Sequence, residues 1–368
     1  MEMKIEKLRK CAECVNDPRR LWGNLRHKLE DVIVIGLITL ICGGVDFVDM
    51  EELGKDKEGW LRGFLELPNG IPDSDTFRRI FENLNPAELA KCLDDWVSGE
   101  REAVKTVGID GKTIRGSANA CHRAYHVVSA WAGEQGITLG QVAVDEKNNE
   151  ITAIPELLDM IDIKGAVVTI DAMGCQTAIA SKIRERGADY VLALKANHKN
   201  LYNRVLKRFN NIDETMLFDE YTETENGHGR TERRTISVIS ACGLDAAGEW
   251  ADLRSIIRCR YIAIENGKEC VVERFYLSSL EPNARRVCGL VRGHWSIENQ
   301  LHWVLDVVFG EDAARAQKGN APLNMNVLRK TALRLLLRVD AGKRVGLKKK
   351  MFRAALKQDF LEMVLFGE

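Results

Sequence analysis

The sequence lacks the features of a secreted or disulfide-built protein. Its 368 residues contain only 10 cysteines, most of them isolated, which is too low a density for a disulfide scaffold. Cys11 and Cys14 form one C-x-x-C pair, but no second pair of Cys or His follows at zinc-site spacing. A structural zinc needs four ligands, so reduced thiols in a cytoplasmic protein fit this pattern better.

Long apolar runs are also missing. The longest, from Val32 to Cys42, has 11 residues, whereas a bilayer-spanning helix needs about 20. We therefore predict a buried helix there and no membrane association. Residues 1–10 have no apolar segment behind them, so we expect no secretory signal. The hydrophobic fraction of 45% is that of a globular protein, and the length predicts two or three domains.

Charge is nearly balanced overall, at −1, but it is distributed unevenly. Residues 313–358 hold 13 Lys and Arg and one acid, Asp340, so the rest of the chain is acidic. Apolar residues recur in this stretch at helical spacing, which favours an amphipathic helix over the alternative of a solvated tail. Such a helix would bind an anionic partner, with DNA, RNA and phosphate-rich surfaces all possible. It would display Arg329, Lys330, Arg334 and Arg338.

Hydrophobic periodicity divides the chain into zones, without internal repeats or low-complexity segments. Three β-type runs followed by alternating helices and strands predict an α/β fold with a mixed sheet and helices on its faces. The zones are a helical domain at 1–100, the α/β core at 101–312 with a β-rich insertion at about 211–282, and the basic helical segment at 313–368.

Local signals predict several details of these zones. Ser74 or Asp75 is expected to cap a helix over Thr76–Leu84. Pro155 suits the first position of a short helix that ends near Ile161. A strand over Val104–Ile109 should end at Asp110, and a long helix over Asn283–Phe309 is expected to break near Gly289 or Gly293. In the insertion we predict strands at 234–240, 256–264 and 270–277.

Two aspartates follow apolar strands, in a position where open α/β sheets place ligands. Asp110 follows Val-Gly-Ile and Asp171 follows Val-Val-Thr-Ile. Each has a structural alternative, because Asp-Gly is a turn dipeptide and Asp171 could cap a helix. Two such acids on one sheet nevertheless favour a cation site, since close carboxylates repel each other unless a cation neutralises them. Gly111-Lys112-Thr113 is not the end of a phosphate-binding loop, because Thr106 stands where that motif needs a glycine.

A third acid lies on the long helix. His294, Glu298, His302 and Asp306 are spaced by four and form a polar ridge beside an apolar one, so Glu298 can reach inward over the sheet edge. A purely solvent-facing ridge is the alternative. The H-E-x-x-H pattern of zinc proteases is absent. Two Asp and one Glu suit Mg²⁺ or Mn²⁺, and two such ions could cleave a phosphodiester and activate a 3′-hydroxyl. Together with the basic segment, this chemistry favours DNA as the substrate.

Ordered motifs along nearly the whole chain make it similar to a known family. They include GIDGKTIRGS from Gly108, VTIDAMGCQ from Val168, GADYVLALK from Gly187 and HWSIENQLHWVLDVVFGED from His294. With these motifs the sequence resembles the H-repeat-associated (ISAs-type) insertion-sequence transposases, which are DDE enzymes with a ribonuclease-H-like core. The N-terminal zone resembles the family's associated helical domain, through LICGG from Leu40 and NGIPDSDTF from Asn69.

The resemblance implies that Asp110, Asp171 and Glu298 form the catalytic, metal-binding triad. It implies metal-dependent cleavage at element ends and strand transfer into target DNA, in the bacterial cytoplasm and on the nucleoid. Because two ends of double-stranded DNA must be held together, we expect a homodimer. A DNA-binding remnant without activity, or a nuclease that does not join DNA, is the alternative. His198 replaces a Gln that the family usually carries after Asn197. Residues in motifs near the site, proposed as DNA contacts, are Lys112, Arg115, His228 and Arg230; Trp295 and Asn299 lie in the same motifs.

Overall fold

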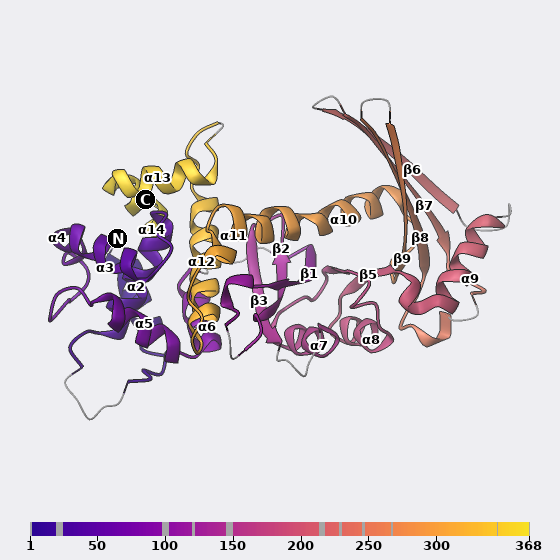
Figure 1. Cartoon of the computed structure of the whole chain (residues 1–368). Helices are drawn as coiled ribbons and strands as arrows, with labels where there is room; N and C mark the ends of the chain where they lie inside the picture. The colour runs from indigo at the N-terminus through magenta and orange to yellow at the C-terminus, as the bar shows by residue number, and fades with distance from the viewer. Residues whose placement is uncertain are drawn as a thin grey trace. The chain divides into compact units, whose positions relative to one another are not determined.

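The computed structural model describes ten segments of the chain, and these form two compact units. Unit 1 consists of residues 1–102, 113–126 and 301–368, and unit 2 of residues 103–112 and 127–300. Each unit therefore combines segments that are far apart in the sequence (Figure 1). The described segments are 2–19, 25–97, 103–119, 122–144, 150–212, 218–227, 230–244, 247–265, 268–343 and 345–367.

Unit 2 is built on one mixed β-sheet, as the sequence predicted. Its described strands follow the order β3-β2-β1-β4-β5-β9-β8-β7-β6. Strands β1, β4 and β5 are parallel, whereas β9 joins β5 antiparallel and the strands beyond it alternate in direction. The insertion thus extends the core sheet. The strands are β1 Thr106–Thr113, β2 His126–Ala132, β3 Ile137–Val144, β4 Val167–Ile170, β5 Asp189–Leu194, β6 Phe218–Gly227, β7 Arg230–Ser240, β8 Ser255–Glu265 and β9 Lys268–Ser278.

Helices cover both faces of this sheet (Figure 1). On one face, α7 (Glu150–Met160), α8 (Thr177–Glu185) and α9 (Lys199–Asn210) bury an aliphatic core against β1, β4 and β5. On the other face, α10 (Ala284–Ser296) packs its apolar residues on β4, β5 and buried residues of the insertion strands β7, β8 and β9. Because successive strand residues point to opposite faces, alternate residues of β1 and β4 lie beneath α10.

Strand β6 was not predicted, because it is acidic and mostly exposed and has no apolar alternation. Polar contacts with α10 hold it in place. Asp219 accepts a hydrogen bond from the backbone N–H of Ala284 at 2.7 Å, at the start of that helix. Arg292 forms ion pairs with Glu223 at 2.6 Å and with Glu225 at 2.7 Å. The acids of β6 therefore fix the helix that leads to the candidate site.

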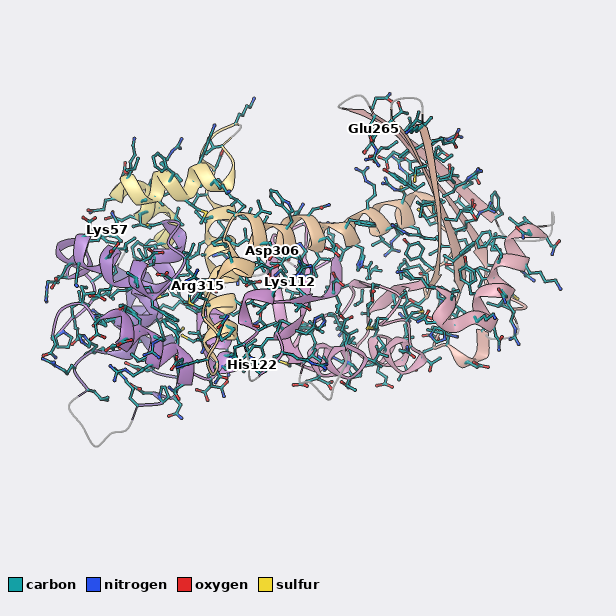
Figure 2. The ribbon with its side chains drawn as sticks, viewed as in Figure 1. Lys57, Lys112, His122, Glu265, Asp306 and Arg315 are labelled. Atoms are coloured by element: carbon teal, nitrogen blue, oxygen red, sulfur yellow. The ribbon has the colours of Figure 1, made fainter. Side chains whose placement is uncertain are left out.

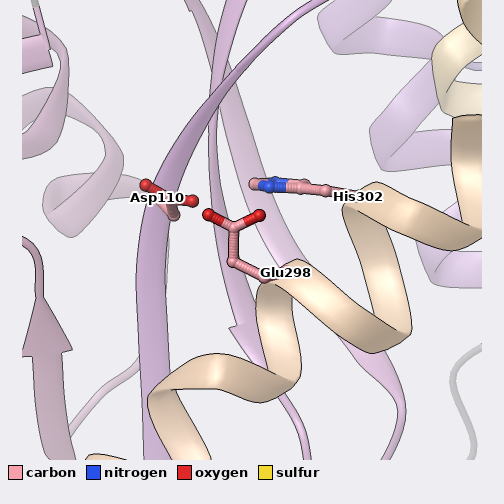
Figure 3. A group of neighbouring side chains, drawn as sticks. All are labelled: Asp110, Glu298 and His302. Atoms are coloured by element: carbon pink, nitrogen blue, oxygen red, sulfur yellow. The ribbon is translucent and has the colours of Figure 1, made fainter. Parts of the chain in front are cut away.

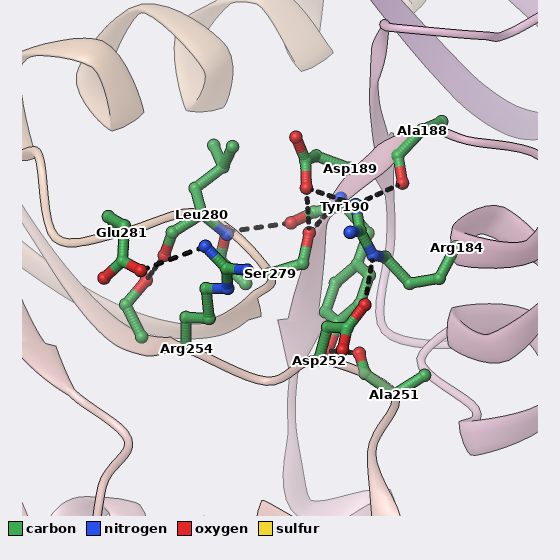
Figure 4. Close-up of polar contacts among 12 residues, drawn as sticks. Arg184, Ala188, Asp189, Tyr190, Ala251, Asp252, Arg254, Ser279, Leu280 and Glu281 are labelled. Carbon is green, nitrogen blue, oxygen red and sulfur yellow. Dashed lines mark hydrogen bonds and ion pairs between the residues drawn. The ribbon is translucent and has the colours of Figure 1, made fainter.

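The junction between β5 and β9 is fixed by a polar network (Figure 4). Arg184 donates hydrogen bonds to Asp189 and to the carbonyl oxygen of Ala188, and forms an ion pair with Asp252 at 2.9 Å. The hydroxyl of Ser279 donates to the same Asp189 carboxylate at 2.8 Å. These contacts attach the insertion to the parallel part of the sheet, at the turn that leads into α10.

Unit 1 is helical, and helix α2 is central to it. All of α2 except Glu30 is buried, so the predicted buried helix over Val32–Cys42 is confirmed. Helix α12 packs against α2, α5 and α6. Within the described residues, every helix is too short or too polar to span a membrane. The helices are α1 Glu2–Ala12, α2 Leu29–Ile41, α3 Phe47–Asp56, α4 Glu58–Leu61, α5 Ser74–Asn83, α6 Pro86–Val97, α11 Trp303–Val307, α12 Ala321–Arg338, α13 Leu347–Leu356 and α14 Gln358–Phe366.

Several local predictions were wrong. Asp73, not Ser74 or Asp75, caps α5, and its side chain accepts a hydrogen bond from the backbone N–H of Thr76. Helix α7 begins before Pro155 and includes it, because the turn that precedes it also packs against the sheet core. The long helix continues through both of its glycines and changes to a π-helical turn at Ile297–His302.

Candidate active site

Asp110 lies within β1, not at its end as predicted. The strand continues to Thr113, but its pairing with β4 ends at Ile109, opposite Ile170. Asp110 is thus the first residue of β1 beyond that pairing. Because residues two apart in a strand share a face, its side chain points to the α10 side of the sheet, like Gly108 and Lys112.

Asp171 follows the last residue of β4 directly, as predicted. Its carboxylate oxygen Oδ1 accepts hydrogen bonds from the backbone N–H groups of Met173 at 3.0 Å and Gly174 at 3.4 Å. Gly174 allows this tight turn, because a Cβ there would lie 2.4 Å from the Ile170 side chain. The helix-cap alternative is wrong, since α8 begins only at Thr177 and Gln176 occupies its N-cap.

The segment after β5 supports the turn that carries Asp171. The side-chain amide of Asn197 donates to the carbonyl oxygen of Ala172 at 2.8 Å. The ring nitrogen Nε2 of His198 lies 2.6 Å from the carbonyl oxygen of Cys175. His198, the residue at which the chain departs from the family pattern, thus braces the loop behind Asp171.

Glu298 lies in the π-helical turn that follows α10, and it faces Asp110 (Figure 3). Carboxylate oxygens of these two residues lie within 4.8 Å of each other. Such π-helical turns are rare in proteins, and those that occur are often found at functional sites. Among the described residues, this close group does not include Asp171. Asp171 still acts electrostatically on Asp110 from the neighbouring strand.

Crowding and burial change the proton affinity of Asp110. Burial first, and then the charges of Glu298 and Asp171, raise the pKa of Asp110 to about 8, from an ordinary value of 3.8. The folded chain therefore holds this proton more tightly than the unfolded chain, and without a cation its stability falls as the pH rises from about 4 to about 8. Excess negative charge of this kind is what a divalent cation would neutralise, and the oxygen ligands suit Mg²⁺ or Mn²⁺.

We expect Mn²⁺ binding to strengthen as the pH rises from about 6 to about 8 and to level off above. Below its pKa Asp110 carries a proton that the cation must displace, so the dissociation constant should fall by up to about tenfold per pH unit. Calorimetric titration of the full chain with Mn²⁺ at several pH values measures this. Asp110→Asn should bind weakly at every pH, and a pH-independent wild-type constant would contradict the assignment.

The sequence did not predict the burial of two residues near these carboxylates. His302 was placed on the polar ridge only, but it is buried, and it offers a ring nitrogen within 4.8 Å of the Glu298 carboxylate in the same helical turn. The spacing of four residues was the available signal. Lys112, predicted as a DNA contact, is only 9% exposed and shares the strand face of Asp110, two residues away. Figure 2 labels it.

The predicted display of basic residues on α12 is wrong for three of the four. Arg329 is 1% exposed, Lys330 8% and Arg334 7%, because the helices of unit 1 surround α12. Arg329 pairs with the fully buried Glu311 at 3.7 Å, and Arg334 with Asp94 of α6 at 2.8 Å. Arg338 is exposed, but it donates to the carbonyl oxygen of Val97.

The remaining predicted DNA contacts have varied surroundings. The Arg115 side chain is exposed, while Arg230 is half-buried beside Glu232 and donates to the Tyr261 hydroxyl at 2.7 Å. Trp295 is 45% exposed, and the Arg274 guanidinium lies over its ring at 4.7 Å. Asn299 is exposed, and His228 lies outside the described residues.

Comparison with known proteins identifies relatives over the full chain. The family described as "Transposase DDE domain" matches residues 104–335, and "DDE_Tnp_1-associated" matches residues 10–97. The chain is 37% identical over 373 residues to "Putative transposase YncI" of Escherichia coli O157:H7, covering 99% of this chain and 95% of the relative. It is 36% identical over 380 residues to "H repeat-associated putative transposase YhhI" of Escherichia coli K12, covering 99% of both.

Proposed function

We propose a strand-transfer activity on one premise: the chain belongs to the family of transposases with a DDE domain. In this proposal it is the transposase of an insertion sequence. It cuts DNA at the ends of the element and joins the freed 3′-hydroxyl to target DNA. The supporting observation is that Asp110 and Glu298, which are far apart in the chain, approach within 4.8 Å beside the strand end that carries Asp171.

The three carboxylates would hold Mg²⁺ or Mn²⁺. Such ions, when bound, activate water or a 3′-hydroxyl and stabilise the leaving oxygen of a phosphodiester. The chain itself would keep the carboxylates together, on two parallel neighbouring strands and on the helix that lies over them. We assign the core a ribonuclease-H-like architecture, because three strands in series precede the α/β alternation and the third acid comes from a later helix.

A basic surface for DNA would lie on two connected loops of unit 1, residues 113–126 and 311–319, here called the two-loop surface. The Gln317 carbonyl oxygen lies 2.8 Å from His122 Nε2, and the Tyr125 hydroxyl donates to the Gly319 carbonyl oxygen at 3.2 Å. At Gly116 a Cβ would lie 2.4 Å from the Ala314 carbonyl oxygen, so the backbones touch.

Four exposed cations occupy the two-loop surface, and Figure 2 labels Arg315 among them and His122 beside them. Asp312 is half-buried and pairs with Arg115 at 3.7 Å. Buried cations of α12 are unavailable to DNA, so we propose this surface, together with Arg230 of unit 2, as the contact to backbone phosphates. Lys112 would act inside the site. The four cations are Arg115, Arg123, Arg315 and Lys318.

Neutralising these four cations to Gln should weaken binding to a labelled duplex and flatten its salt dependence. The slope of log K against log salt should fall by about 0.9 for each phosphate that the variant no longer neutralises. Fluorescence anisotropy at several salt concentrations measures it. The matched control neutralises four exposed cations of unit 2, Lys164, Lys199, Arg204 and Lys207. Equal flattening in both variants would contradict the two-loop surface.

A cleavage and joining assay tests the proposed function. DNA carrying the gene's own flanking sequence, target DNA and Mg²⁺ or Mn²⁺ should yield joined products, and EDTA should abolish them. Cleavage without joining would identify a nuclease, and binding without cleavage an inactive remnant. Two ends must be held together, so we also propose a homodimer that acts on nucleoid DNA in the bacterial cytoplasm.

A further inference from the structure

His294 connects the helix that leads to Glu298 with the strand that leads to Asp171. It lies on α10, and its ring nitrogen Nδ1 is 3.0 Å from the hydroxyl oxygen of Thr169 on β4. Thr169 precedes Asp171 by two residues, and His294 precedes Glu298 by four. Each partner of this hydrogen bond is therefore close in the sequence to a candidate ligand.

The direction of the hydrogen bond follows from the partners of Thr169. Its hydroxyl also lies 3.4 Å from the Val107 carbonyl oxygen, to which it donates. A hydroxyl has one proton but two acceptor lone pairs, so when Thr169 directs its proton at Val107, its oxygen accepts from His294. The histidine is therefore the tautomer with its proton on Nδ1. Burial lowers the pKa of His294.

From the His294–Thr169 contact, the distance along the strands to Asp110 and Asp171 is similar to the distance along the helix to Glu298. Gly108 of β1 pairs directly with Thr169 of β4, and a Cβ at Gly108 would lie 3.8 Å from His294 Nδ1. His294 thus lies over the Gly108–Thr169 pair. Two residues further along the strands, about 6.6 Å, are Asp110 and Asp171. Four residues further along the helix, about 6 Å, is Glu298.

The residues that follow His294 keep the helix close to β1. Ile297 is fully buried, and its Cβ would lie 3.8 Å from a Cβ at Gly108. The absence of a side chain at Gly108 lets α10 approach β1 directly. The α-helical geometry ends at Ser296, and the wider π turn follows. His294 is thus the hydrogen-bonded contact of α10 with the catalytic strands just before the helix changes its winding.

We propose that the His294–Thr169 hydrogen bond is the positioning contact that fixes the register of α10 on β4 and thereby holds Glu298 opposite Asp110. His294 is a positioning residue and acts through Glu298. The inference rests on the proposed function in one respect, namely that Asp110, Asp171 and Glu298 hold the divalent cation. It assigns to the first histidine of the His294–Asp306 ridge a role distinct from that of Glu298.

Direct Mn²⁺ binding to the full chain, followed by the electron paramagnetic resonance of free Mn²⁺, tests this proposal without relying on activity. His294→Leu and Thr169→Val should each weaken binding by about tenfold, as loss of a partner that orients a ligand does. The double variant should bind no more weakly than either single one. Thr169→Ser and His294→Asn should bind almost like the wild type, because a serine hydroxyl and an asparagine amide can remake the bond.

A matched control is Thr235→Val, because the Thr235 hydroxyl oxygen lies 3.0 Å from the Thr222 hydroxyl oxygen, in a side-chain pair between β7 and β6. It should leave Mn²⁺ binding unchanged. Wild-type affinity in His294→Leu would overturn the positioning role alone, since the wild type would still bind Mn²⁺. Equal loss in His294→Leu and His294→Asn would also overturn it, because the Thr169 bond would not be the cause. A wild-type chain without Mn²⁺ affinity would overturn both the positioning role and the proposed metal site.

Discussion

Replacing Asp171 with asparagine is expected to reduce strand cleavage and joining by about a thousandfold or more. This is the scale seen when a group that stabilises charge in the transition state is removed. Asparagine keeps the oxygen that accepts the N–H groups of Met173 and Gly174, so the turn should persist while the negative charge is lost. Product analysis on DNA with the gene's flanking sequence, alongside thermal melting, separates lost chemistry from lost folding.

The matched control for this variant lies at the other end of the same strand. Asp162 precedes β4 and accepts a hydrogen bond from the Lys164 backbone N–H at 3.1 Å, in a similar turn. Asp162→Asn should retain full activity. Near-wild-type activity in Asp171→Asn, or an equal loss in both variants, would refute the assignment of Asp171 to the triad.

Replacing Arg329 with methionine is expected to lower the free energy of unfolding by about 3–5 kcal/mol, the cost of breaking a buried ion pair. Glu311 is fully buried, and without the guanidinium its charge would lose the cation that lies 3.7 Å away, although the Asn326 amide would still donate to it at 2.8 Å. Chemical denaturation followed by circular dichroism measures the change. A double variant with Glu311→Gln should recover part of the loss, because it also removes the buried charge.

An exposed ion pair of the same length provides the comparison. Arg115 and Asp312 also lie 3.7 Å apart, but the Arg115 side chain is 81% exposed. Arg115→Gln should therefore change the free energy of unfolding by less than about 1 kcal/mol. If Arg329→Met destabilises the chain no more than Arg115→Gln does, the buried pair does not stabilise the fold.

The parts of the site that could be predicted are those determined by residues that are close together in the sequence. Asp171 follows an apolar strand, and a residue in that position lies at the carboxyl end of the strand, where open α/β sheets bind ligands. The buried helix α2 was predicted because its apolar residues are contiguous. Parallel pairing of β1 with β4 then brings Asp110 beside Asp171, which the βαβ pattern implies.

The parts that were missed depend on partners distant in the sequence. The charge of Arg334 is visible in the sequence, but its partner Asp94 comes from α6, so burial of that pair could not be predicted from α12 alone. Strand β6 has no apolar alternation, because its pairing with β7 and its polar contacts with α10 hold it at the end of the sheet. The π turn was missed because spacing by four residues was interpreted as a regular α-helix.

The acidic strand β6 has a consequence for solubility. It is the last strand of the sheet, so one row of its backbone N–H and C=O groups has no neighbouring strand among the described residues. Such an open edge is a template for aggregation, and natural proteins often protect it with charge. Asp219, Glu220, Glu223 and Glu225 place four negative charges along it, so a second copy approaching edge to edge would meet like charge. The residues that attach β6 to α10 also keep the sheet from growing beyond it.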